Sequence, residues 1–185
     1  TDERNPWLIA SAAALPLAMF IYAAWLLNYR ELGVRPGVIF SFLLAADLPL
    51  LALVLLNPRL ALAHLVGGTA AFLVLVSWTT GYLSSNLQNW ALAAYLAFAL
   101  LHAAFPVVLQ RLRPGTAPVW WGHLFPLLAL LLVLGPLFKS LQVTWLFWPT
   151  VLLVDAAAVC LALLTGAVLG VLAALDERIA VRYAL

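Results

Sequence analysis

Residues 36–56 read PGVIFSFLLAADLPLLALVLL, an apolar stretch that contains a single charged residue, Asp47. A helix rises 1.5 Å per residue, so about 20 apolar residues cross a hydrocarbon core about 30 Å thick. The stretch has this length, and its apolar residues follow one another without the alternation of a barrel strand. It therefore predicts a helix that spans a membrane.

Five further apolar runs lie on either side of this stretch. The six predicted helices cover residues 7–27, 36–56, 60–82, 90–109, 119–138 and 144–175. Charged or amide side chains with Pro, Gly or Ser end the runs, and such short loops join antiparallel neighbours. The sequence thus predicts one all-α, polytopic transmembrane bundle of about six spanning helices, with both termini on the same side. The last run is too long to cross upright, so we expect it to tilt or to continue along the surface.

The composition agrees with a membrane protein. Of 185 residues, 66% are hydrophobic and 9% are charged, and the mean hydropathy is +1.10. Soluble domains are about 45–50% apolar and about 25% charged. These values exclude a cytosolic enzyme and a disordered chain, and the absence of a basic run excludes nucleic acid as a partner. The expected surroundings are the lipid bilayer and other membrane helices, of the same or of a partner chain.

The basic residues predict an orientation. The side that holds both termini carries six of them, and the opposite side carries three. The first set is Arg4, Arg59, Arg111, Arg113, Arg178 and Arg182, and the second is Arg30, Arg35 and Lys139. The positive-inside rule then places both termini in the cytoplasm. The Ala-, Leu- and Arg-rich composition favours a bacterial protein, so we expect the bacterial inner membrane.

Two carboxyl groups lie deep in predicted spans. Asp47 is near the middle of 36–56, and Asp155 is about a third of the way into 144–175. An Asp at a helix centre costs about 2.5–3.5 kcal/mol on insertion scales, so we expect neither to face lipid unless it is protonated. With His102, the deepest histidine, they are candidates for a proton or ion relay. Alternatively, each serves as a hydrogen-bonded packing contact between helices.

The histidines could also bind a metal or a haem, because neutral imidazole is a common ligand. His64, His102 and His123 all lean toward the predicted cytoplasmic half of the membrane. They form no i, i+4 pair and have no carboxylate close in sequence. The sequence therefore predicts no cofactor, and a haem-bearing redox subunit is the second alternative.

Small residues predict close helix contacts. Gly67 and Gly68 lie in 60–82, and Gly166 and Gly170 form a Gly-x-x-x-Gly pair in 144–175. Small side chains let helix backbones approach, so these glycines are candidates for helix packing. Cys160, the sole cysteine, is expected to pack as a small apolar side chain.

Four segments carry a resemblance to a known family. They are LALVLLNPR at 51–59, LVGGTA at 65–70, VWWGHLFP at 119–126 and GPLF at 135–138. The chain resembles a large bacterial family of predicted multi-pass membrane proteins with a domain of unknown function. The resemblance implies a long array of spanning helices, of which this chain would be one portion, and it implies no catalytic residue or substrate.

Motifs of catalysis do not appear: the serines lack a Gly-x-Ser-x-Gly context, and there is no HExxH, P-loop or dinucleotide fingerprint. The sequence therefore does not favour an enzyme. The leading hypothesis is a structural or interaction module of a larger membrane protein or complex. The alternative is a proton-coupled carrier or channel for a small solute that uses Asp47, Asp155 and His102.

Overall fold

A computed structural model describes residues 6–113 and 120–164 of the chain. Within these residues there are helices and turns and no strand, which confirms the predicted all-α bundle. The long helices are α1 (Pro6–Leu26), α3 (Pro36–Leu56), α4 (Ala61–Tyr82), α5 (Gln88–Leu112), α6 (Leu124–Val133) and α8 (Phe147–Leu164). The short ones are α2 (Arg30–Gly33), α7 (Gly135–Phe138) and the 3-10 turns η1 (Pro58–Leu60), η2 (Ser85–Leu87) and η3 (Trp120–His123).

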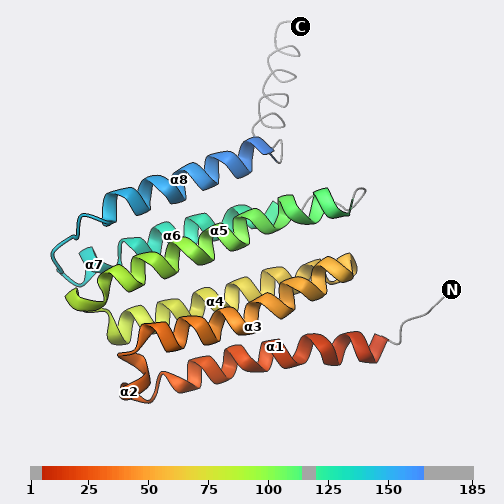
Figure 1. Ribbon diagram of the computed structural model, residues 1–185, viewed down its shortest axis with the longest axis horizontal. Helices are drawn as coiled ribbons and strands as arrows, with labels where there is room; N and C mark the ends of the chain where they lie inside the picture. The colour runs from red at the N-terminus through yellow and green to blue at the C-terminus, as the bar shows by residue number, and fades with distance from the viewer. Residues whose placement is uncertain (1–5, 114–119, 165–185) are drawn as a thin grey trace, which may run out of the picture.

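The helices lie roughly antiparallel in four layers (Figure 1). The pair α3 and α4 and the pair α5 and α6 form the two inner layers, and α3 also contacts α5. Helix α1 covers α3 and α4 on one outer side, and α8 covers α5 and α6 on the other. The start of α1 and the end of α8 lie at the same end of the bundle (Figure 1). We call this the α8-exit end and the opposite end the α2 end.

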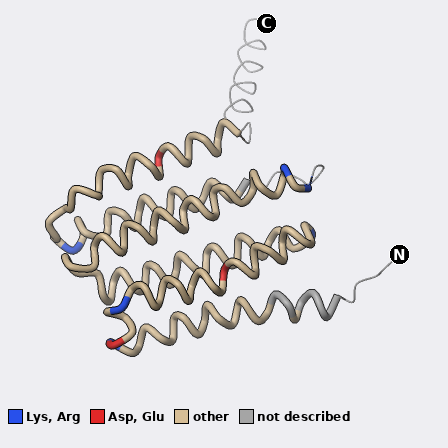
Figure 2. The backbone as a smooth tube through the Cα atoms, viewed as in Figure 1, with Lys and Arg blue, Asp and Glu red and all other residues tan. Residues whose placement is uncertain are grey.

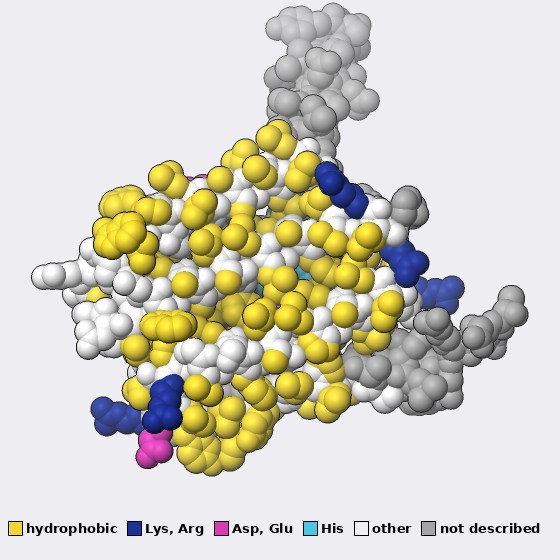
Figure 3. All heavy atoms as spheres, in the orientation of Figure 1, with side chains coloured by type: hydrophobic (Ala, Val, Ile, Leu, Met, Phe, Trp, Pro, Cys, Tyr) yellow, Lys and Arg dark blue, Asp and Glu magenta, His cyan; other side chains and the backbone are white. Residues whose placement is uncertain are grey.

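The chain has the build of a multi-pass integral membrane protein. Five helical segments of the described residues are long and apolar enough to cross a membrane, and α1 adds the shorter apolar segment Ala14–Leu26. The face seen in Figure 3 carries mostly apolar side chains, and large apolar residues are exposed along all the long helices, as a surface facing lipid requires. Charged residues gather at the two ends of the helices, apart from one acidic position inside each of α3 and α8 (Figure 2).

Helix limits differ from the sequence prediction in the second half of the chain. The predicted span 119–138 is divided between η3, α6 and α7, with a break at Leu134 just before Gly135 and Pro136. Pro136 lacks a backbone N–H and cannot continue the α6 ladder, so a new helix begins there. Ser140 then takes a left-handed φ of 53°, and α8 begins at Phe147, later than predicted. The rest of the predicted last run, beyond Leu164, lies outside the described residues.

Side-chain hydrogen bonds hold the α2 end together. The Trp78 Nε1–H donates to the carbonyl of Gly33 at 2.7 Å, and the Tyr82 hydroxyl donates to the carbonyl of Leu27. A Cβ at Gly33 would lie 2.2 Å from the Tyr82 ring, so only glycine lets α2 approach α4 this closely. These long-range bonds fix the α1–α2–α3 turn against α4.

Candidate functional site: a row of buried polar side chains

The centre of the bundle holds a carboxyl–imidazole pair. Asp47 comes from the middle of α3 and His102 from the facing side of α5, and both side chains are fully buried. Asp47 Oδ2 and His102 Nε2 are 3.0 Å apart, which is ion-pair distance, although their directions do not meet hydrogen-bond geometry. The structure thus brings together two of the three residues that the sequence singled out for a relay.

A second imidazole touches this pair. His64, one turn into α4 and fully buried, has its ring centroid 5.2 Å from that of His102. The second Asp47 oxygen and both His64 nitrogens have no hydrogen-bond partner among the described residues. A buried polar atom without a partner costs about 1–3 kcal/mol, so a folded chain keeps such atoms where another role maintains them. We call Asp47, His64 and His102 the central cluster.

Aromatic rings enclose the central cluster. Phe125 of α6 lies 4.6 Å from the His102 ring and 5.2 Å from the His64 ring, centroid to centroid. Phe105 lies 4.6 Å from His64 on the other side. The cluster therefore sits in apolar surroundings, where electrostatic interactions between its members are strong.

Two glycines of α4 make room for the cluster. A Cβ at Gly67 would lie 2.4 Å from the Leu50 side chain and 3.6 Å from Asp47 Oδ1. A Cβ at Gly68 would lie 2.4 Å from the Phe125 ring and 3.0 Å from His102 Cε1. Larger residues would push α4 away from α3, α5 and α6 and would separate His64 from the pair.

A row of polar residues extends from the cluster toward the α2 end. Gln88, Tyr95 and His102 are spaced seven apart on α5, and all three are fully buried. Residues seven apart stand on one helix face, about 10.5 Å from one another along the axis. The Thr79 hydroxyl of α4 donates to the Leu75 carbonyl at 2.6 Å. Its oxygen therefore accepts a hydrogen bond from the Tyr95 hydroxyl. Both side-chain polar atoms of Gln88 have no hydrogen-bond partner within the described chain.

Sequence reasoning missed Gln88, Tyr95 and Thr79. The i, i+7, i+14 spacing on one helix was visible, and it would have indicated a shared face. The contact between Tyr95 and Thr79, however, joins α5 to α4 and could not be read from α5 alone. With the central cluster, these residues form the polar row.

A polar hollow lies at the α2 end of the row. It measures about 720 Å³ and its lining includes Asn28, Arg30, Ser77, Ser84 and Leu87. Leu87 directly precedes Gln88, the first member of the polar row. Gln88 itself is fully buried and does not line the hollow, so the hollow ends one residue before the polar row.

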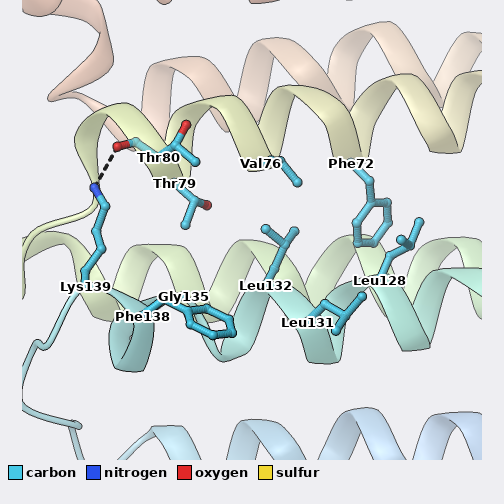
Figure 4. A pocket seen from close by; sticks show the side chains of 10 residues that line it. All are labelled: Phe72, Val76, Thr79, Thr80, Leu128, Leu131, Leu132, Gly135, Phe138 and Lys139. Carbon is cyan, nitrogen blue, oxygen red and sulfur yellow. Dashed lines mark hydrogen bonds between the residues drawn. The ribbon is translucent and has the colours of Figure 1, made fainter.

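An apolar groove runs along the lipid-facing side of α4 and α6 (Figure 4). It measures about 280 Å³. At its α2 end, Lys139 Nζ donates to the Thr80 carbonyl at 2.8 Å, so a cation closes an otherwise apolar channel (Figure 4). At its inner end, Phe72 lines the groove and lies 6.3 Å, centroid to centroid, from the His102 ring. The groove thus connects the membrane surface with the wall of the central cluster.

Asp155 lies elsewhere. It occupies the exposed face of α8, so the structure does not bring it together with Asp47 and His102 in an interior relay. Cys160, expected to be packed inside, is also exposed on α8. The cause is the outer position of α8, which contacts the bundle along one face only.

The remaining candidates are placed as follows. His123 lies partly buried in η3, and the described residues hold no group of three or more His, Cys, Asp or Glu side chains that could bind a metal ion. The ring centroids of His64 and His102 are 5.2 Å apart, too close for a porphyrin to lie between the two imidazoles. Gly166 and Gly170 lie outside the described residues.

No protein-family model, no curated protein and no solved structure matches this chain. The resemblance to the bacterial multi-pass family stays a prediction.

Proposed function

We propose that this chain is a proton-coupled membrane carrier or channel whose proton path is the polar row. The observation that carries the proposal is the row itself: buried polar groups extend from Gln88 at the α2 end, through Tyr95, to the Asp47–His102 pair and His64. Ionisable groups inside a membrane are rare, and they mark proton relays when they face the bundle interior.

The central cluster can hold and pass one proton. With the proton on His102, the two side chains form an ion pair over a separation of 3.0 Å. With the proton on Asp47, both side chains are uncharged. His64, in ring contact with His102, is the next acceptor and lies one turn from the opposite end of α4. Gln88, Tyr95 and His102 are each about 10.5 Å apart along the helix axis, which is longer than a hydrogen bond. Water that enters from the α2 end therefore completes the proton path.

A packing role explains the site less fully. A single buried pair would fix the register of α3 against α5, as polar contacts between membrane helices do. It would not account for the burial of Gln88, Tyr95 and His64, nor for buried polar atoms without partners among the described residues. The length of the row favours a pathway.

The groove of Figure 4 is the place for a coupled solute. Its apolar wall and the Lys139 cation fit a small amphipathic molecule with an anionic end, and Phe72 links its inner end to His102. We place the protein in the bacterial cytoplasmic membrane, with the α8-exit end in the cytoplasm. The hollow beside Gln88 then opens to the outside.

The test is proton flux into liposomes that contain the purified protein and a pH-sensitive dye, driven by a potassium diffusion potential. We expect flux well above that of empty liposomes, a loss of at least about tenfold in Asp47→Asn and His102→Gln, and partial retention in Asp47→Glu. Asp155→Asn is the matched control, because it changes a carboxyl group at similar depth outside the row. No flux from the unmodified protein, or full flux in folded Asp47→Asn, would overturn the proposal.

A further inference from the structure

Helix α8 is the least enclosed of the membrane spans. Of its residues, 22% are buried, against 39–56% in the other four spans of the described chain. One face packs on α5 and α6, with Val154 and Leu161 buried there. The opposite face is open along its whole length.

Asp155 stands half way along this open face. Leu152 and Val159, one turn to either side, are exposed at 68% and 58%. The Asp155 carboxyl group makes no hydrogen bond or ion pair with any residue of the described chain. In a membrane, the carboxyl group would thus lie among lipid tails at the depth where an acidic side chain is least tolerated.

Charge complementarity indicates what covers it. A carboxyl group at this depth is satisfied by a basic side chain at the same depth, from a helix packed against α8. A second copy of the chain has none to offer from its described residues, because every Lys and Arg there lies at a helix end. The histidines at mid-depth, His64 and His102, are buried in the central cluster.

We propose that the open face of α8 is a docking site for a membrane-spanning helix of a partner protein, and that this helix carries a basic side chain near its centre. Asp155 pairs with that side chain, and the exposed leucines and valine around it contact the apolar remainder of the partner helix. The site is separate from the polar row, so its role does not depend on proton flux.

The experiment uses synthetic helices as defined partners. One peptide is a Leu/Ala helix of about 20 residues, the length of a membrane span, with one central Lys, and its matched control has Leu at that place. The protein, with Cys160→Ser and a dye on Asn86→Cys in the exposed η2 turn, is placed with each labelled peptide in phosphatidylcholine vesicles. Energy transfer then measures binding as the peptide concentration rises.

We expect the Lys peptide to bind about tenfold more tightly than the Leu peptide, the difference that a polar contact between membrane helices can give. Asp155→Leu should bring the ratio of the two peptide affinities close to one. Asp155→Lys should instead favour a peptide with a central Glu. Asp47→Asn should leave the ratio unchanged.

A ratio near one for the unmodified protein, or one that persists in Asp155→Leu, would overturn the proposal. Energy transfer between two labelled copies of the protein that disappears in Asp155→Leu would also overturn it, because the face would then be covered by a second copy. Asp155→Leu replaces an exposed side chain with an apolar one, so the variant retains its fold.

Discussion

Asp47 and Asp155 are the same residue type at similar depth in two apolar helices, and the structure gives them opposite surroundings. Asp47 is fully buried and lies 3.0 Å from His102, whereas Asp155 is exposed on the outer face of α8. Asp47 belongs to an inner helix with neighbours on several sides, and Asp155 to an outer helix with neighbours on one. A carboxyl group in a membrane span can therefore pair with a side chain inside its own bundle or stay available at the bundle surface.

The largest expected difference between the two is in stability. Asp47→Ala leaves His102 buried without its partner, so we expect the free energy of unfolding to fall by about 3–5 kcal/mol. Asp155→Ala removes an exposed group and should not lower it. Unfolding in mixed micelles by increasing denaturing detergent measures both. The double variant Asp47→Leu with His102→Leu should recover most of this loss, because two apolar side chains of similar volume leave neither member of the pair unpaired. If stability is not recovered, the loss in Asp47→Ala comes mainly from the cavity and not from the unpaired imidazole.

The next prediction concerns the glycines that shape the inner site. Gly68→Ala places a Cβ 2.4 Å from the Phe125 ring, and overpacking of this kind costs about 1–3 kcal/mol. Gly81→Ala in the same helix is the matched control, because its Cβ would meet nothing within 4 Å. We expect this control to stabilise the chain by about 0.5–1 kcal/mol through helix propensity. If both variants have the same effect, the close approach of α4 to the central cluster does not hold.

The outer carboxyl group should limit the stability of the isolated chain. Asp155→Leu exchanges an acidic side chain that faces lipid for an apolar one, and we expect a gain of up to about 2.5–3.5 kcal/mol in membrane insertion of α8. An insertion assay with α8 as the test segment measures this directly. Asp155→Asn should give a smaller gain, and an unchanged insertion efficiency in Asp155→Leu would show that Asp155 does not face lipid.

The smallest expected effect on stability is that of Tyr95→Phe. It removes the hydroxyl that contacts Thr79 and should cost about 1 kcal/mol. The same variant should slow proton flux severalfold, because it removes the middle member of the polar row. Trp78→Phe, which loses the bond to Gly33 and leaves a cavity outside the polar row, costs at least as much stability and is a control that should leave flux unchanged. Equal proton flux in the two variants would mean that Tyr95 is not part of the proton path, which would then include only the central cluster.

The spans and the residues worth testing could be predicted from the sequence. The run 36–56 indicated a helix, and α3 occupies Pro36–Leu56. Asp47 and His102 were singled out because polar groups in a span are costly, which depends on depth and not on packing. Gln88 and Tyr95 were not, because an amide near a helix start and an aromatic residue in a span are both ordinary.

Hydropathy and the rise per residue were enough to predict a membrane solvent, the approximate limits of α1, α3, α4 and α5, and the depth of each polar residue in its run. Which polar residues face one another was set by the packing of the helices. Leu and Ala surround most of these helices on all sides, so no amphipathic pattern marks an inner face. The placing of α3 between neighbours and of α8 at the edge made Asp47 a partner of His102, and it left Asp155 open to the membrane.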